Sequence, residues 1–366
     1  MKLKCEQKKI LQAVMLAEKI SGRNLTLPVL NCILIQVSKN TVTFRSTNLE
    51  IGIELNIPCT VLEEGITAVP GSVLVNTLSL LDPNKEITLT TRNNNLVISS
   101  ETSNTTIKAF PYDDFPTLPT VNTERSFKVK TESYIQGLKS VWYSASLSTV
   151  KPELASIYVY AKGDKCYFVA TDSFRLAEKI VIIDSLPEFE PFLIPIRNVS
   201  EIIRVLENAQ EEVEIRLSTN QIAFVFNNIY ITSRLIDGSF PDYKQIIPKE
   251  STTEIIALKQ DVLHTLKKTI LFSDNFNQIH FSLNPSKKNF IIESQNADVG
   301  ETKDSVSATI EGEELDINFN HRYITDCFQS IIADSVVLCF SGLGKPMTIQ
   351  GVSDNSFLYL VMPMNK

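Results

Sequence analysis

The sequence predicts an α+β fold made of three tandem copies of one unit of about 120 residues. Three observations predict it. Two amphipathic helical stretches occur in each third of the chain, strand-like runs of alternating or β-branched residues accompany them, and both patterns repeat at an interval near 125 residues. Several sequence patterns that recur at nearly the same interval favour a repeat. Three unrelated α+β domains of average size are the alternative.

The helical stretches give the repeat its register. The first stretch of each copy covers residues 5–20, 131–146 and 259–273. Their central leucines are 127 and 128 residues apart, at Leu11, Leu138 and Leu266. The second stretches are 70–81, 195–207 and 320–331, and they begin at intervals of 125 residues with Pro70, Pro195 and Asn320. Proline costs no backbone hydrogen bond in a first helical turn, which supports helix starts at the first two positions.

Strand-like runs and turns complete each copy. Runs such as TVTFRS, CYFVAT and NFIIES predict strands, with turns at Asn93-Asn94-Asn95 and Gly163-Asp164. Two Phe-Pro junctions place Phe115 and Phe240 125 residues apart. We therefore expect domains at 1–120, 126–249 and 250–366, each with two helices and roughly eight strands.

Composition indicates a folded cytoplasmic protein. Of 366 residues, 43% are hydrophobic and 21% charged, which is typical of a globular chain. The N-terminus lacks the apolar core of a signal peptide, and no apolar run is long enough to span a membrane. The six cysteines include no C-x-x-C pair, so they predict buried, reduced thiols and no zinc site.

The distribution of charge decides whether a polyanion is a plausible partner. The net charge of −7 argues against a general nucleic-acid binder. The six predicted helical stretches, counted together with Lys4 just before the first of them, contain eleven basic and seven acidic residues, a net of +4, which leaves −11 for the rest of the chain. A basic helix layer facing a polyanion would have this pattern. Helices with ordinary solvated faces are the alternative.

Catalytic and metal-binding patterns are missing from the sequence. The three histidines have no metal-ligand spacing, and Gly342-Leu343-Gly344-Lys345 lacks the flanking residues of a phosphate loop, so it predicts a hairpin turn. Asp172 beside Arg175, and Asp113 beside Asp114, are interpreted as solvated loop carboxylates. We therefore expect no cofactor, no metal and no enzymatic activity. The competing hypothesis is an enzyme or ligand-binding protein with a small-molecule site between its domains.

Several strings along the chain carry a family resemblance. ATDSFRLA at 170–177, FPDYKQIIP at 240–248 and YLVMPM at 359–364 closely resemble peptide-pocket motifs of the bacterial DNA polymerase III beta subunit, the sliding clamp. LTLPVLNCILIQV, TNLEIGIE and TAVPGSVLVNTL resemble its first domain. The resemblance runs from residue 1 to 366 and includes the threefold repeat.

The resemblance implies a homodimeric ring of six domains in head-to-tail order, with helices lining the hole and sheets outside. A closed ring holds DNA by topology, so its phosphate contacts can be few, weak and independent of sequence. The implied partners are double-stranded DNA, a second copy of the chain, the DNA polymerase III alpha subunit, the clamp loader and other proteins with clamp-binding motifs. No membrane is involved.

The resemblance also implies the functional residues. A hydrophobic pocket for partner peptides, between the second and third domains, would comprise Leu154, Thr171, Ser173, Phe174, Arg175, Leu176, Pro241, Ile246, Pro346, Val361, Met362, Pro363 and Met364. Apolar and methionine side chains suit short hydrophobic motifs, and Arg175 with backbone groups would orient the peptide. The alternative interpretation of the methionine-rich C-terminus is ordinary core packing.

Departures from the family pattern concern both partners. Ser173-Phe174 stands where the family often has Gly-His or Gly-Tyr, and Gln245 stands where a basic residue is common, so peptide preference is expected to differ. Ser72 replaces a frequent arginine, and KPELAS at 151–156 lacks an aromatic pair. The expected DNA contacts are therefore Arg23, Lys139, Arg197, Lys267 and Arg322.

The implied dimer interface joins the first domain to the third domain of the partner. The matching stretches are Thr105 to Ala109, including Ile107, and the region of Leu271 and Phe272. An exposed strand edge carrying Ile107 would promote aggregation unless it were paired, so an edge-to-edge dimer is expected.

Overall fold

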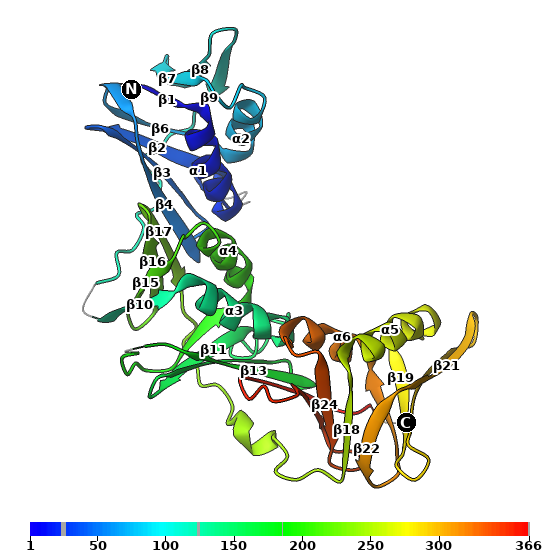
Figure 1. Ribbon diagram of the computed structural model, residues 1–366. Coiled ribbons are helices and arrows are strands. Elements are labelled where there is room, and N and C mark those ends of the chain that lie inside the picture. The colour runs from blue at the N-terminus through cyan, green and yellow to red at the C-terminus, as the bar shows by residue number, and fades with distance from the viewer. Residues whose placement is uncertain (23–26, 123–124, 185, 365–366) are drawn as a thin grey trace. The chain divides into compact units, whose positions relative to one another are not determined.

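The computed structural model describes residues 1–22, 27–122, 125–184 and 186–364. These residues form two compact units, shown in Figure 1. Unit 1 comprises Met1–Glu132 and Arg197–Leu235, and unit 2 comprises Ser133–Ile196 and Ile236–Lys366. The second repeat thus contributes strands to both units.

Unit 1 contains two sheets and three helices. Its strands are β1 (Lys2–Glu6), β2 (Cys32–Ser38), β3 (Thr41–Thr47), β4 (Ile51–Pro58), β5 (Thr60–Glu63), β6 (Gly65–Pro70), β7 (Glu86–Arg92), β8 (Asn95–Ser99), β9 (Asn104–Lys108), β10 (Ser126–Lys130), β15 (Glu212–Leu217), β16 (Gln221–Phe226) and β17 (Ile229–Arg234). Its helices are α1 (Gln7–Ile20), α2 (Gly71–Ser79) and nearly all of α4 (Ile196–Leu206). Helices α1 and α2 pack side by side (Figure 1).

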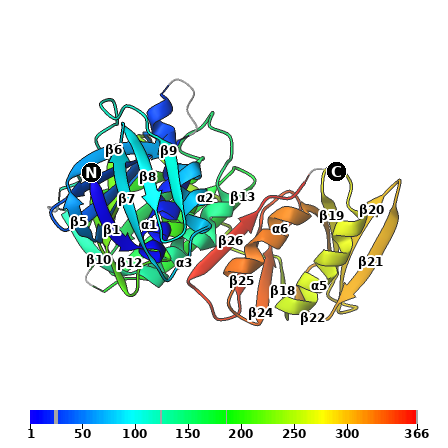
Figure 2. The same cartoon turned by 90° about the horizontal axis from the view of Figure 1, so that it is seen from above.

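Unit 2 repeats this arrangement of helices against sheets. Its strands are β11 (Ser156–Lys162), β12 (Lys165–Thr171), β13 (Arg175–Ile182), β14 (Phe192–Pro195), β18 (Thr253–Leu258), β19 (Gln278–Asn284), β20 (Asn289–Asn296), β21 (Gly300–Val306), β22 (Ala308–Gly312), β23 (Leu315–Asn320), β24 (Ser335–Phe340), β25 (Met347–Gly351) and β26 (Phe357–Val361). Its helices are most of α3 (Thr131–Val141), α5 (Lys259–Thr269) and α6 (His321–Cys327). Helices α5 and α6 lie next to each other (Figure 2).

The sheets join neighbouring repeats. An eight-stranded sheet has the order β10-β15-β16-β17-β4-β3-β2-β6, so β17 of the second repeat pairs with β4 of the first. A nine-stranded sheet has the order β14-β11-β12-β13-β26-β25-β24-β18-β22, so β26 of the third repeat pairs with β13 of the second. Two smaller sheets remain, β5-β1-β7-β8-β9 and β21-β20-β19-β23. Each matches one half of a joined sheet.

The threefold repeat is confirmed, and helix starts keep its register. Helices α2, α4 and α6 begin at Gly71, Ile196 and His321, at intervals of 125 residues. Each directly follows a strand that ends at Pro70, Pro195 or Asn320. The Asn320 side chain caps α6 by accepting hydrogen bonds from the backbone N–H groups of Arg322 and Tyr323, which satisfies two unpaired donors of the first turn.

The helices are shorter than their sequence patterns. The stretch 5–20 begins as a helix only at Gln7, because Cys5 and Glu6 belong to β1 and pair with β7. The stretches 131–146, 259–273 and 320–331 give way to the 3-10 turns Trp142–Ser144, Ile270–Phe272 and Phe328–Ser330. In the described residues the three repeats contain nine, eight and nine strands, close to the expected eight.

Two-residue turns connect the strands as expected. Asn93 and Asn94 both have positive φ, which gives the hairpin twist that matches flanking strands, and Gly163 has φ 62° before β12. Residues 342–345 form the turn between β24 and β25, as the sequence predicts. Asn227 and Asn228, both with positive φ, form another Asn-Asn turn, between β16 and β17.

The core agrees with the reduced state expected from the cysteines. All six are free; Cys5, Cys32, Cys166 and Cys327 are buried, while Cys59 and Cys339 are partly exposed. Within the described ranges, no helix is both long and apolar enough to cross a membrane.

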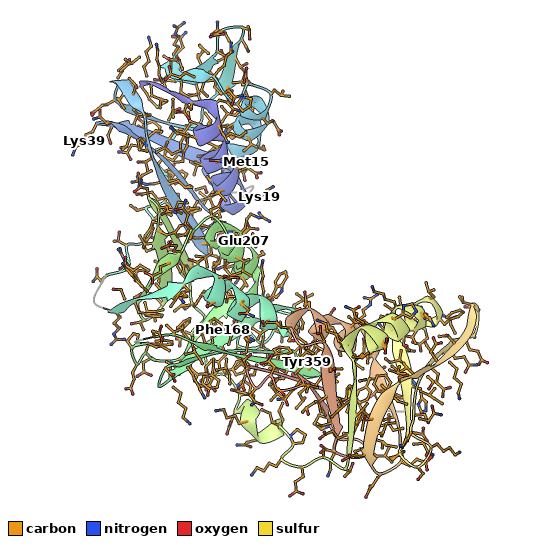
Figure 3. All side chains as sticks on the ribbon, in the orientation of Figure 1. Met15, Lys19, Lys39, Phe168, Glu207 and Tyr359 are labelled. Carbon is orange, nitrogen blue, oxygen red and sulfur yellow. The ribbon has the colours of Figure 1, made fainter. Side chains whose placement is uncertain are left out.

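Helix α3 depends on a glycine for its contact with the nine-stranded sheet. Phe168 projects from β12 toward α3 (Figure 3), and a Cβ atom at Gly137 would lie 2.5 Å from its Cε2 atom. We expect Gly137→Ala to lower the free energy of unfolding by about 1–3 kcal/mol, because overpacking outweighs the gain of about 1 kcal/mol in helix propensity. Urea denaturation measures this change in the free energy of unfolding. The cost should shrink in a Phe168→Leu background, and an equal cost there would contradict this explanation.

Candidate functional site

The described residues of the expected peptide pocket all belong to unit 2, and three segments bring most of them together. The turn from β12 to β13 carries Thr171 to Leu176, the chain from Val361 to Met364 follows β26, and residues 241–246 belong to a connection around the 3-10 turn Tyr243–Ile246. Strand register aligns Arg175 with Val361, and Val361 with Met347, the residue after Pro346. Leu154 is buried in the loop before β11.

The β12–β13 turn is rigid. Ser173 has φ 78°, a conformation that a non-glycine residue rarely adopts. The Asp172 carboxylate holds the turn by accepting hydrogen bonds from the backbone N–H groups of Phe174 and Arg175. The Thr171 hydroxyl donates to the Arg175 carbonyl oxygen at 2.7 Å. As a result, the Phe174 side chain is 60% exposed on a fixed backbone.

Arg175 stabilises the site from within. Its guanidinium bonds to Asp172 at 3.0 Å and to Asp326 of α6 at 2.6 Å, and it lies 4.5 Å from the centre of the Tyr323 ring. Burial alone would lower the pKa of Arg175, but Tyr359, Asp326 and Asp172 outweigh it and raise the pKa. With its side chain 12% exposed, Arg175 links three segments of the fold.

The interpretation of Asp172 as a solvated loop carboxylate is wrong. Its side chain is only 14% exposed and bonds to the backbone of its own turn and to the Arg175 guanidinium. The Asp113 and Asp114 side chains are exposed, as expected.

The C-terminal segment is held along the turn. The Met362 N–H donates to the Phe174 carbonyl oxygen, and the Met364 N–H donates to the Asn318 carbonyl oxygen, both at 2.8 Å. Val361 is fully buried in β26, whereas Met362, Pro363 and Met364 are partly exposed. The interpretation as core packing thus fits Val361, and the residues after it remain partly open to solvent.

An aromatic cluster, missed in the sequence, fixes the segment that carries Pro241 and Ile246. Tyr243 is buried against Val169, Leu176 and Leu360. Its hydroxyl donates a short hydrogen bond to Glu178 and shares another, at 2.8 Å, with Tyr160. Phe240 stacks on Tyr158, Tyr160 stacks on Tyr167, and the Lys244 ammonium lies over the tyrosine rings. The alternation of tyrosines in SIYVYAK was the available signal.

Exposure divides the expected pocket residues into two groups. Thr171, Leu176, Leu154 and Val361 are buried, so they support the site. Phe174 and Ile246, which is 48% exposed, present apolar surface to solvent, and Pro241 is exposed in the same connection as Ile246. Exposed apolar side chains on a hydrogen-bonded turn can bind a short hydrophobic peptide.

Charge on the helices is positive, as the sequence predicts. Within their observed bounds, α1 to α6 contain ten Lys and Arg against five Asp and Glu, a net of +5. Of the expected DNA contacts, Lys139 lies on α3, Arg197 on α4, Lys267 on α5 and Arg322 on α6. Arg197 lies 3.9 Å from Glu50 with 59% of its side chain exposed. Arg23 lies outside the described residues.

The expected dimer residues lie on one sheet edge and beside another. Thr105 and Ile107 belong to β9, an edge of the five-stranded sheet. Leu271 is 70% exposed and Phe272 partly buried in the 3-10 turn after α5, which contacts the edge strand β21. Strand β9 is a sheet edge, as expected, but the Ile107 side chain points into the core and is 4% exposed.

The structure offers no metal-binding cluster within the described ranges: no group of three or more His, Cys, Asp or Glu side chains is placed to hold an ion. The two described hollows lie elsewhere. One of about 560 Å³ is lined by polar residues of β19 to β21, and one of about 470 Å³ lies between the end of α2 and the β8–β9 turn.

Comparison with known proteins identifies the fold as that of a DNA sliding clamp. The Bacillus subtilis DNA polymerase sliding clamp superposes with a TM-score of 0.94 at 24% identity, covering 100% of this chain and 99% of the other. The Thermotoga maritima DNA polymerase III beta subunit gives the same values. The beta sliding clamps of Rickettsia bellii and Bacillus subtilis are 27% and 26% identical, each over 100% of this chain and 99% of theirs.

The chain belongs to the DNA polymerase III beta subunit family. The family's N-terminal, central and C-terminal domain models match residues 1–119, 128–242 and 244–365 in tandem. This family consists of non-catalytic processivity factors, so the protein is not an enzyme.

The Tyr243 hydroxyl should contribute measurably to stability. We expect Tyr243→Phe to lower the free energy of unfolding at neutral pH by about 1–3 kcal/mol, because Glu178 and Tyr160 lose a buried partner. Burial and Glu178 raise the pKa of Tyr243 in the folded state. Its contribution is therefore present below the ordinary tyrosine pKa of about 10 and is lost as pH rises above it.

Urea denaturation between neutral pH and pH 11 measures this effect. The difference between wild type and Tyr243→Phe should shrink above about pH 10. Tyr167→Phe is the control, since it keeps the stacked ring and should change stability by less than about 0.5 kcal/mol. A Tyr243→Phe difference that does not depend on pH would contradict the assignment.

Proposed function

We propose that two copies of this chain close head to tail into a ring around double-stranded DNA, and that the β12–β13 turn with its neighbours tethers replication proteins to it. The observation that supports the ring most directly is the way the repeats share sheets. Each junction inside the chain pairs the last strand of one repeat, β17 or β26, with the middle strand of the preceding repeat, β4 or β13.

The same pairing of neighbouring repeats leaves two strands, β9 and β21, at the free edges of their sheets. By position in the repeat, β9 corresponds to β17 and β26, and β21 corresponds to β4 and β13. Both are edge strands of the two smaller sheets. Pairing β9 with β21 of a second copy would complete a nine-stranded sheet of the kind already present in unit 2. Two such head-to-tail joints, related by a twofold axis, close a ring of six repeats.

Apolar surface accompanies both edges. Leu80, which is 88% exposed, follows α2 and shares a hollow with Thr105 of β9. Leu271, Phe276 and Val299, each at least 63% exposed, lie in the segments around β21. A free strand edge with exposed leucines invites association, and dimerisation would bury it.

The basic helices are proposed to face the DNA. Four helices carry the described candidate contacts, Lys139, Arg197, Lys267 and Arg322. Lysine and arginine contacts to phosphates do not depend on sequence and weaken with salt, which suits a ring that slides. We retain domain boundaries at 1–120, 126–249 and 250–366, and we place the protein in the cytoplasm with the DNA polymerase III alpha subunit, the clamp loader and other clamp-binding proteins as partners.

Retention on DNA of different topology tests the ring. The assembled protein should remain on nicked circular DNA and be lost when the circle is linearised, because only a closed ring is held by topology. Leu271→Ala should shorten retention on circles and raise the monomer fraction in native mass spectrometry, since it removes exposed apolar surface beside β21. Equal retention on circles and linear DNA would sink the proposal.

The control for Leu271→Ala is Leu343→Ala, which removes a similarly exposed leucine from the β24–β25 turn. It should leave the dimer intact. Ile107 is unsuitable as an interface probe: a lysine there should unfold the first domain, because the side chain is buried.

The peptide site is tested with its two exposed apolar residues. Phe174→Ala and Ile246→Ala should each weaken binding of a peptide from the DNA polymerase III alpha subunit about tenfold or more, the scale expected for an apolar anchor. Fluorescence anisotropy measures the affinity, and melting temperatures should stay near that of the wild type. Ile182→Ala, at the far end of β13 and 66% exposed, is the matched control. Unchanged affinity in both pocket variants would place the site elsewhere.

A further inference from the structure

Two cysteines far apart in the sequence lie opposite each other in unit 1. Strands β1 and β5 are antiparallel neighbours (Figure 2), with Leu3 opposite Val61 and Lys4 opposite Thr60. The next step of this register places Cys5, the fourth residue of β1, opposite Cys59, the residue just before β5. We propose that Cys5 and Cys59 are a redox modification site, which a peroxide converts into an intramolecular disulfide.

The alternation of side chains places both thiols on the same face of the sheet. Leu3 and Cys5 are buried while Lys4 between them is exposed. On the facing chain, Cys59 and Val61 are partly buried while Thr60 is exposed. Residues directly opposite in an antiparallel pair have Cα atoms about 4.5–5.5 Å apart, within the range of about 4.4–6.8 Å that a disulfide spans.

Contacts of the sulfur atom agree with this register. The Cys5 thiol lies 3.9 Å from the carbonyl oxygen of Pro58, the residue bonded to Cys59. The Cys59 backbone is held in turn, since its N–H donates to the Asn40 carbonyl oxygen at 3.0 Å. The two thiols also sense each other electrostatically, because Cys5 contributes to raising the pKa of Cys59.

The strand registers place no second cysteine opposite Cys32, Cys166 or Cys339. Cys32 lies opposite Pro70, and Cys339 opposite Thr348 and Glu254. Cys339 is partly exposed like Cys59, and burial raises its pKa as well. It therefore serves as a matched cysteine without a facing thiol.

The chemistry needs one equivalent of peroxide and balances in two steps. The Cys59 thiolate, the more exposed of the two, attacks hydrogen peroxide: an S–O bond forms, the O–O bond breaks, and hydroxide leaves and takes up a proton to give water. Cys5 then attacks the sulfenic sulfur of Cys59: an S–S bond forms, the S–O bond breaks, and a second water leaves. A thiol reductant restores both cysteines.

Burial of the Cys59 thiol limits the rate of this oxidation. Desolvation, with a smaller contribution from Cys5, raises the pKa of Cys59 to about 11, so little thiolate is present at neutral pH. Because the thiolate is the reacting form, the rate should rise about tenfold per pH unit between pH 7 and pH 9. The site responds to sustained oxidation and leaves the protein reduced otherwise.

The test uses the purified full chain treated with hydrogen peroxide. After alkylation under denaturing conditions, non-reduced peptide mapping should find the Cys5 peptide linked to the Cys59 peptide, with two hydrogens lost and two fewer of the six thiols titratable. Dithiothreitol should reverse the link. Cys59 recovered as sulfinic or sulfonic acid beside an alkylated Cys5 would overturn the proposal, as would a link only between chains.

Cysteine variants distinguish disulfide formation between the facing Cys5 and Cys59 from general oxidation of cysteines. In Cys5→Ser, Cys59 should progress to sulfinic acid and no linked peptide should form, whereas Cys339→Ser should form the Cys5–Cys59 link at the wild-type rate. In the wild type, Cys339 should gain oxygen without linking. If Cys59 formed a disulfide with Cys339 as readily as with Cys5, the cysteines would have reacted in the unfolded chain, and the proposal would fail.

Discussion

The structure depends on one interaction, the antiparallel pairing of strands that belong to neighbouring repeats. The pairs β17–β4 and β13–β26 turn the halves of adjacent repeats into continuous sheets of eight and nine strands. Backbone hydrogen bonds set this joint, and cross-strand apolar pairs such as Leu176 and Leu360 bury it. Each repeat therefore completes its neighbour's sheet, and the compact units do not coincide with the sequence repeats.

The proposed peptide site is a consequence of the same joint. The pairing of β13 with β26 places Arg175 opposite Val361, so the β12–β13 turn and the C-terminal segment meet across a sheet shared by the second and third repeats. Hydrogen bonds then hold the turn and the segment that carries Ile246: Arg175 bonds to two carboxylates, and Tyr243 bonds to Glu178 and Tyr160. Buried polar networks of this kind make the surrounding backbone rigid. The exposed side chains of Phe174 and Ile246 are attached to this backbone.

Much of this architecture could be predicted from the sequence because periodicity records which residues face a core. The 125-residue interval of Pro70, Pro195 and Asn320 gave the helix starts, and Asn-Asn and Gly-Asp dipeptides gave the turns. Short strands before helices, such as β1 and β10, were missed, since four or five residues carry little periodic signal. Pairing between repeats could not be predicted either, because it depends on which edges meet.

Individual side chains were harder to place than elements. The sequence indicated a strand edge that carries Ile107 but did not say which face this side chain takes, and a one-residue shift of register would reverse that face. The role of Tyr243 needed contacts with β11 and β13 that local sequence does not contain.

The connectivity of the shared sheets also determines where the assembly is weakest. At β17–β4 and β13–β26 the paired strands belong to one polypeptide, so a broken pair stays tethered and re-forms at a high effective concentration. A joint between β9 and β21 of two chains has no such tether, and its occupancy falls with dilution. In the proposed ring, a gate that admits DNA therefore belongs at the seam between chains, because the seams inside a chain re-form whenever they break.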